Sequence, residues 1–218
     1  MDSRHAARHA HALDLARRAL AFGARHSTVG FLTGLDRWAL RRYFIFEPEE
    51  CPKAGNRPSS PECFLKNATL FTMVDASVVY AIYRDHRDRW PDAAEALLSA
   101  YGHYARRRVP PELSFDRAFY LVSWTDRLWP WAGREAVFRL TACTRCHCRY
   151  LAPPALADDH ARDCPFCKLK LRYGREPRIQ VRFAERRYPR ITEALARLVT
   201  TPRNAAELGS RLVKGLCC

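Results

Sequence analysis

The stretch CTRCHCRYL at residues 143–151 and the stretch CPFCK at residues 164–168 decide the architecture of the C-terminal half of this chain. Each stretch contains one Cys-x2-Cys pair, and the four residues involved are Cys143, Cys146, Cys164 and Cys167. Two such pairs, here 17 residues apart, are typical of a structural zinc site, in which two tight knuckles point their sulfurs at one ion. Four protein ligands fill a tetrahedral zinc and leave no position for water or substrate. The motif therefore predicts one structural Zn²⁺ per chain and argues against metal catalysis.

The residues around the motif leave the ligand set open to substitution. Cys148 and His147 follow the first pair directly and are alternative ligands, as is His160 in an acidic loop. The other cysteines show no metal spacing: Cys51, Cys63, Cys217 and Cys218. Of these, Cys51 and Cys63 are expected to pack as small hydrophobic residues or to lie in a loop. The total of nine cysteines is odd, and the N-terminus alternates His, Arg and Ala without the apolar centre of a secretory signal. Both features favour a reducing, cytoplasmic location over a disulfide framework.

The overall composition favours a polyanionic partner. The chain of 218 residues carries a formal net charge of +14, and its pI is near 9.8. Hydrophobic residues make up 48% of it, which is ample for the core of one medium domain or two small ones. No apolar run reaches the roughly 18 residues that a membrane helix needs, so no membrane association is expected.

Half of the excess charge lies between Lys168 and Arg190, directly after the last cysteine of the motif. Nine basic residues and two acidic ones give this segment a local charge of +7, and aromatic residues are interleaved. The basic residues are Lys168, Lys170, Arg172, Arg175, Arg178, Arg182, Arg186, Arg187 and Arg190. A charge run is often only a solvated face. Its density and its attachment to a zinc module nevertheless favour nucleic-acid binding, in which arginines suit bidentate contacts with phosphate or guanine.

Apolar spacing and capping residues predict helices in most of the remaining chain. The predicted helices are His9–Ala24, Leu35–Phe44, Glu62–Arg84, Pro91–Arg106, a helix from Phe115 to Leu128 capped by Ser114, and Ile191–Val199. The Phe115–Leu128 segment is apolar around most of its circumference, which predicts burial in a core or against an obligate partner. Short strands are expected over 136–141 and at 150–151, residues 178–183 alternate basic and apolar, and residues 48–61 are expected to form a loop.

These patterns predict a mostly α fold with a small four-cysteine zinc-knuckle or ribbon subdomain near the C-terminus. We place a helical domain at residues 1–135, the zinc-binding and basic segment at 136–190, and a C-terminal extension at 191–218.

Residues 24–44 resemble a helix-turn-helix in length and pattern. Ser27 and Thr33 are candidate N-caps, and Leu35, Ala39 and Tyr43 are expected to face inward. The basic side chains on the outer face would then be candidate DNA contacts: Arg37, Arg41 and Arg42. The alternative is an ordinary helical hairpin with a basic exterior.

Several segments, in order along residues 10–185, together resemble a known family. They are Gly23–Arg25, Leu35–Tyr43, the Pro-containing loop before Phe64, Arg117–Phe119 with Leu121 and Val122, and Tyr150 after the first knuckle. With the cysteine spacing and the basic tail, they resemble the C subunit of the bacterial flagellar master transcriptional activator, the FlhC family. The C-terminal extension of this chain is longer and richer in arginine than is usual in that family.

The resemblance implies a DNA-binding activator of flagellar genes. Members of the family assemble with FlhD, two C subunits with four D subunits, and contact RNA polymerase. The resemblance also implies structural zinc on Cys143, Cys146, Cys164 and Cys167.

Other functions remain as rivals to the activator. One is an RNA-binding zinc protein, and another is an interaction protein or divergent paralogue without promoter specificity. An enzyme is not expected, because no Ser-His-Asp set, phosphate loop or open metal site is evident.

Overall fold

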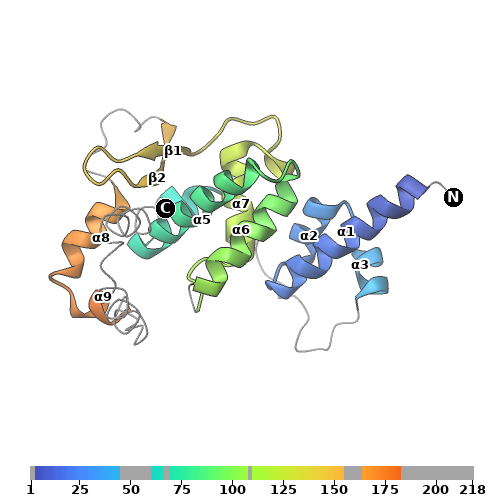
Figure 1. Ribbon diagram of the computed structural model, residues 1–218, viewed down its shortest axis with the longest axis horizontal. Coiled ribbons are helices and arrows are strands. Elements are labelled where there is room, and N and C mark those ends of the chain that lie inside the picture. Colours follow the sequence, from blue (N-terminus) through green and yellow to red (C-terminus); the bar gives the residue numbers. More distant parts are fainter. Residues whose placement is uncertain (1–2, 45–59, 66–68, 108–109, 155–163, 183–218) are drawn as a thin grey trace, which may run out of the picture.

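The computed structural model describes residues 3–44, 60–65, 69–107, 110–154 and 164–182. In chain order its elements are α1 (Ser3–Ala21), α2 (His26–Thr33), α3 (Arg37–Tyr43), α4 (Glu62–Leu65), α5 (Leu70–Arg87), α6 (Ala93–Arg107), α7 (Phe115–Asp126), the 3-10 turn η1 (Trp129–Trp131), β1 (Arg139–Ala142), β2 (Arg149–Ala152), α8 (Pro165–Tyr173) and α9 (Pro177–Arg182). Figure 1 shows α1–α3 at one end, α5–α7 in the middle, and the two strands with α8 and α9 at the other end. The predicted fold class, mostly helical with a four-cysteine unit beside a small hairpin, is confirmed.

Helix α7 lies at the centre of the hydrophobic core. Ser114 caps it as predicted, because the side-chain oxygen accepts a hydrogen bond from the Arg117 N–H. Its side chains are buried around most of the helix, and Phe119 stacks on Trp129 with ring centroids 4.8 Å apart. The apolar circumference of this segment is therefore explained by a core formed within one chain.

A buried carboxylate joins the N-terminal helices to this core. Asp116, in the first turn of α7, accepts hydrogen bonds from the Thr28 hydroxyl (2.6 Å) and the Arg25 backbone N–H (3.1 Å). It also forms an ion pair with the Arg25 guanidinium (3.2 Å). The N-cap residue of α2, Arg25, makes no side-chain capping bond. Asp116 of α7 instead provides the hydrogen-bond acceptor at the start of α2.

Several predicted helix boundaries are wrong for local reasons. Asp36, not Thr33, caps α3, because its carboxylate accepts from the Ala39 N–H at 2.7 Å. Ser27 lies inside α2, and the Thr33 hydroxyl donates back to the Val29 carbonyl. The buried residue of α3 is Leu40, whereas Tyr43 is 48% exposed.

The predicted helix Glu62–Arg84 is two helices, because Thr69 caps a new one, α5. Residues 178–182 belong to helix α9, and the preceding helix α8 was not predicted at all. The expected helix Ile191–Val199 lies outside the described residues.

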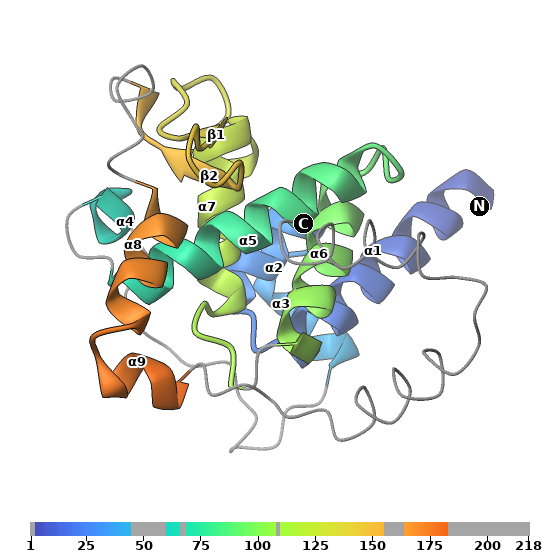
Figure 2. The same ribbon diagram turned by 60° about the vertical axis from the view of Figure 1, so that its left-hand side comes forward.

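Helix α5 supports the C-terminal unit. It packs against α6 and α7 in the helical core and also against β2 and α8, an arrangement visible in Figure 2. The Leu151 N–H of β2 donates to the buried Ser77 hydroxyl at 3.2 Å. Nη2 of Arg149 lies 2.9 and 3.0 Å from the two carboxylate oxygens of Asp85. Helix α5 therefore packs against both the helical core and the small sheet.

We predict that Phe119→Ala lowers the free energy of unfolding by about 3–5 kcal/mol, because it leaves a cavity beside α7. Trp38→Ala is the control, since Trp38 is 77% exposed and its loss is expected to change stability by no more than about 0.5 kcal/mol. Urea unfolding followed by circular dichroism measures both. Equal destabilisation by the two substitutions would contradict this description of the core.

Candidate metal centre and basic helices

The small sheet and helix α8 present the four cysteines of the motif. Strands β1 and β2 pair antiparallel, with Ala142 opposite Arg149, and the first Cys-x2-Cys pair lies in the turn between them. The turn closes through hydrogen bonds from the Cys143 N–H to the Cys148 carbonyl (3.0 Å) and from the His147 N–H to the Cys143 carbonyl (2.9 Å). His147 adopts a positive φ of 59° to complete it. This tight knuckle turns Cys143 and Cys146 toward the start of α8.

The second pair begins α8. Cys164 is the N-cap residue, Pro165 occupies the first helical position, and Cys167 lies in the first turn. Proline fits there because its fixed φ suits the first turn and no N–H is needed. The sequence Cys-Pro-x-Cys is therefore also a helix start, a signal from which α8 could have been predicted.

The four sulfurs form one compact cluster. The Sγ atoms of Cys143 and Cys167 are 3.7 Å apart, and so are those of Cys146 and Cys164. All four lie within 4.8 Å of one another. A tetrahedral zinc with bonds of about 2.3 Å requires sulfurs about 3.8 Å apart, whereas a disulfide requires about 2.05 Å. The cluster could therefore bind a metal such as zinc, and its cysteines are free thiols.

The surroundings of these thiols show why the cluster suits a cation. Burial raises the pKa of Cys167 to about 11, and it raises the pKa of Cys164 as well. For Cys143 burial acts in the same direction, but backbone N–H groups of Cys146 and Arg145 outweigh it and lower the pKa to about 7. The site therefore stabilises the thiolate of Cys143 readily and those of Cys164 and Cys167 poorly. A divalent metal would supply the positive charge that four thiolates need.

The alternative ligands do not join the cluster within the described residues. His147 is exposed, and Cys148 contributes its backbone carbonyl to the knuckle. Cys63 is half-buried against the hydrophobic core, where burial raises its pKa. His160, Cys51, Cys217 and Cys218 lie outside the described residues.

The basic residues after the cluster are exposed where the structure describes their side chains. Lys168, Lys170 and Arg172 lie on α8, Arg175 follows it, and Arg178 lies on α9. Arg172 forms an ion pair with Glu176 at 2.6 Å. Arg182 ends α9, and Arg186, Arg187 and Arg190 lie outside the described residues.

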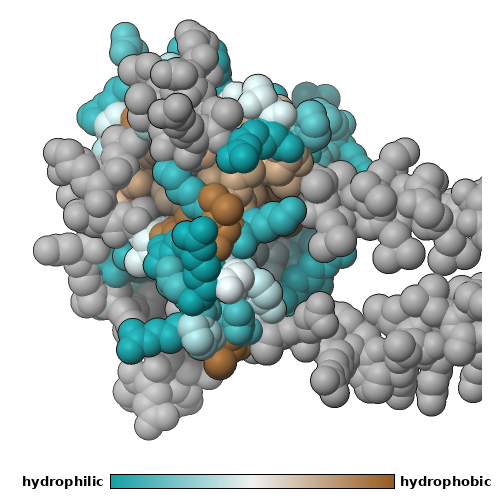
Figure 3. Space-filling view, turned by 90° about the vertical axis from the view of Figure 1, so that its left-hand side faces the viewer, coloured by the Kyte–Doolittle hydropathy of each residue, from teal (hydrophilic) through white to brown (hydrophobic). Residues whose placement is uncertain are grey.

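This end of the molecule also exposes apolar side chains. Figure 3 looks onto it and shows a few hydrophobic residues in brown among hydrophilic ones in teal. Leu171, Tyr173 and Val181 of α8 and α9 are 59%, 38% and 78% exposed. Basic and apolar side chains are therefore mixed on one surface. Among the α9 residues whose side chains are described, only Ile179 is buried.

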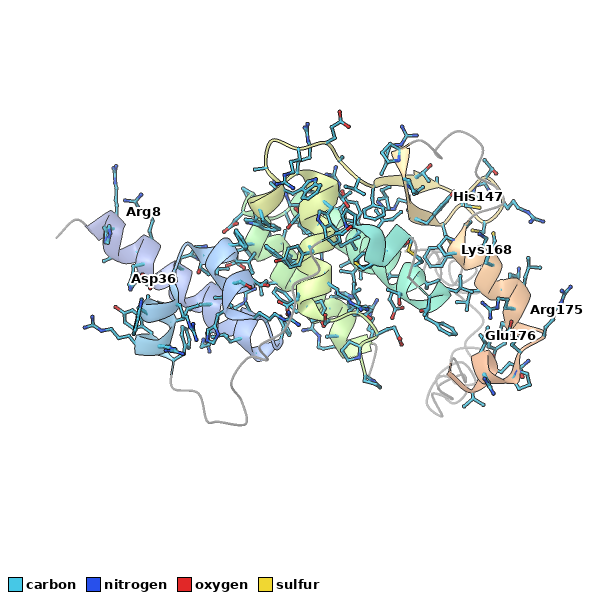
Figure 4. All side chains as sticks on the ribbon, turned by 180° about the vertical axis from the view of Figure 1, so that it is seen from behind. Arg8, Asp36, His147, Lys168, Arg175 and Glu176 are labelled. Atoms are coloured by element: carbon cyan, nitrogen blue, oxygen red, sulfur yellow. The ribbon has the colours of Figure 1, made fainter. Side chains whose placement is uncertain are left out.

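The second basic element, α3, lies at the opposite end of the molecule. Its Arg37, Arg41 and Arg42 are exposed, as predicted for an outer face. Trp38 is 77% exposed beside them and was not among the predicted contacts. Its spacing from Arg41 and Arg42 places it on their face of the helix, and this spacing is the signal that could have identified it. In Figure 4, Asp36 at the start of α3 lies far along the molecule from Lys168 and Arg175. The described residues among the twelve predicted DNA contacts therefore do not form one patch.

Comparison of the chain with protein-family models and with curated proteins found no match. Among the described residues, no helix has the length and apolar character needed to cross a membrane.

Two neighbouring cysteines provide a matched test of the ligand set. We predict that Cys146→Ser reduces bound metal to well below one ion per chain, because it removes one of four clustered sulfurs, whereas Cys148→Ser leaves one ion bound. Elemental analysis of the purified variants measures the ratio of metal to protein. Loss of metal from Cys148→Ser with retention in Cys146→Ser would overturn the assignment.

Proposed function

We propose that this protein is a zinc-stabilised, DNA-binding subunit of a transcriptional activator of the FlhC type, which acts with an FlhD-type partner at promoters of flagellar genes. The observation that carries the proposal is the direct connection between the four-cysteine cluster and an exposed basic surface. Two of the cysteines, Cys164 and Cys167, lie at the start of the same helix that bears Lys168, Lys170 and Arg172.

Zinc is the proposed metal because of the donor set. Four thiolates in tetrahedral arrangement select zinc or an iron–sulfur centre among common biological metals, and sulfurs 3.7 Å apart fit a single small ion. With four protein ligands the ion is structural. Its role here would be to hold the start of α8 against the β1–β2 turn.

The basic surface on α8 and α9 is proposed to contact DNA phosphates. Lys170, Arg175 and Arg178 make no ion pair with other described residues, so their charges are available to a polyanion. Contacts of this kind give affinity and orientation and release counterions, whereas base-specific contacts are needed for sequence recognition. The exposed residues Leu171 and Val181 interrupt this surface and would reach apolar parts of DNA or of the partner.

Helix α3 is proposed as a second contact, with DNA or with the FlhD-type partner. Exposed tryptophan beside arginine is typical of binding surfaces, and Trp38 lies beside Arg37. An assembly of two C and four D subunits would present α8–α9 twice, at a fixed spacing along the duplex. RNA polymerase is the further partner implied by the resemblance.

The proposal is tested by co-expression with an FlhD-type protein, followed by measurement of mass, zinc content and gel shifts on a flagellar promoter. A stable complex that binds the promoter in preference to scrambled DNA and RNA is expected. Cys164→Ala is expected to lose zinc and DNA binding together, because the basic helix loses its anchor. Equal binding of all DNA would favour an interaction protein without promoter specificity, and preference for RNA would favour the RNA-binding rival.

The basic surface has its own test. We predict that Arg175→Gln weakens DNA binding about equally for all sequences and lowers the slope of log K against log salt by about 1, as expected for one lost phosphate contact. Arg134→Gln, at an exposed residue outside α3, α8 and α9, is the control with the same charge change. Fluorescence anisotropy at several salt concentrations measures both. Identical slopes for the two variants would place the DNA elsewhere.

A further inference from the structure

A cavity of about 400 Å³ lies between α5 and α6, and its lining includes no residue of the cysteine cluster, of α8 or of α9. Helices α5 and α6 lie side by side in the helical core (Figures 1 and 2). The volume is at the lower end of the range for small-molecule sites, which is roughly 300–1,000 Å³. Val78 and Ile82 provide apolar lining. The size suits a metabolite and is too small for a peptide or a nucleic acid.

Two imidazoles face each other in this cavity. The rings of His86 on α5 and His103 on α6 are 6.1 Å apart and nearly perpendicular. Nδ1 of His86 is buried and has no hydrogen-bond partner within the described part of the chain. A buried ring nitrogen without a partner is costly, by about 1–3 kcal/mol, and a ligand that donates or accepts a hydrogen bond would offset that cost.

The charged residues of the cavity favour an anion. Arg89 and Arg107 line it, and neither forms an ion pair with another described residue. Each is close enough to influence an imidazole, Arg89 that of His86 and Arg107 that of His103. The carboxyl ends of α5 and α6 each carry a partial negative charge of about half a unit. The positive charge of the two guanidinium groups is larger than the sum of these partial charges.

Both carboxylates of the cavity are already engaged. Asp85 forms the ion pair with Arg149 of β2. Asp75 accepts a hydrogen bond from the Tyr104 hydroxyl at 2.8 Å, and that hydroxyl in turn accepts from the Leu113 N–H. Arg149 balances the charge of Asp85, and Tyr104 satisfies the hydrogen-bonding capacity of the buried Asp75. Arg89 and Arg107 are therefore the charged groups of the lining that a ligand can still engage. No metal-binding group of three His, Cys, Asp or Glu occurs here among the described residues.

We propose that this cavity binds a small organic dianion, a phosphate monoester or a dicarboxylate, with Arg89 and Arg107 as the charge partners and His86 and His103 as hydrogen-bonding groups. The lining of the site includes none of the proposed DNA contacts. It touches α5, the helix on which the cysteine-bearing unit is docked, so an occupied site would also stabilise the helix that supports β2.

Titration of the full-length, metal-loaded protein tests the proposal. Glycerol 3-phosphate, succinate and inorganic phosphate are the probes, and isothermal calorimetry measures their binding. Saturable binding of glycerol 3-phosphate or succinate at millimolar concentration or below is expected, and the tighter of the two identifies the class. Arg89→Gln and Arg107→Gln are each expected to weaken it about tenfold, because each removes a charge-assisted hydrogen bond.

The control is Arg106→Gln, which removes the same charge from the neighbouring position of α6, outside the cavity lining, where it acts on His103 more weakly than Arg107 does. It is expected to leave the affinity unchanged within about twofold. Absence of saturable binding for every probe, saturable binding of inorganic phosphate alone, or equal weakening by Arg106→Gln and Arg107→Gln would overturn the proposal.

Histidine titration by NMR gives a second readout. In the free protein, burial and then nearby arginines hold the pKa of His86 and of His103 below the ordinary value, with Asp85 acting oppositely on His86. A bound dianion favours the imidazolium form, so it is expected to raise both pKa values. An unchanged pKa of both histidines at saturating ligand would contradict binding at this site.

Discussion

The C-terminal half depends on bringing four sulfurs from two segments to within 4.8 Å of one another. The pieces that this cluster joins are short: two strands of four residues each, and helices of nine and six residues. Neither a two-stranded hairpin nor a helix of that length is stable in water alone. Burial also raises the pKa of the two cysteines at the start of α8, Cys164 and Cys167. A metal ion would resolve both problems, because it would cross-link the segments and compensate the charge.

Helix α5 connects the cysteine-bearing unit to the rest of the molecule. Ser77 and Asp85 fix strand β2 on it, and the Tyr80 hydroxyl donates to Asp126 at the end of α7. The helix is thus shared between the core, the cysteine-bearing unit and the cavity that contains His86. A change at any of these places acts on a helix that the other two also contact, so their stabilities are not independent.

The predicted DNA contacts that the structure describes lie in two places and not in one. Basic residues of α3 and of α8 with α9 lie at opposite ends of the molecule, and Arg89 and Arg107 line a cavity between them. Exposed charges farther apart than about 8–10 Å are largely screened at physiological salt, so the two ends act as separate surfaces. A polyanion could therefore contact α8 and α9 as one surface, whereas the whole set of predicted arginines would not form a single contact.

The sequence by itself determined the features that depend on neighbours along the chain. The Cys-x2-Cys spacing, the Ser114 cap and the buried character of the following helix are local, and the structure agrees with them. Tertiary structure decided what depends on distant residues. Asp116 contacts Arg25 and Thr28 across about 90 positions in the chain, so the start of α2 could not be assigned from its own residues. His86 and His103, on different helices, face one cavity only because α5 and α6 pack together. Spacing along one helix or knuckle can be derived from fixed backbone geometry, whereas the meeting of two elements depends on how the whole core packs.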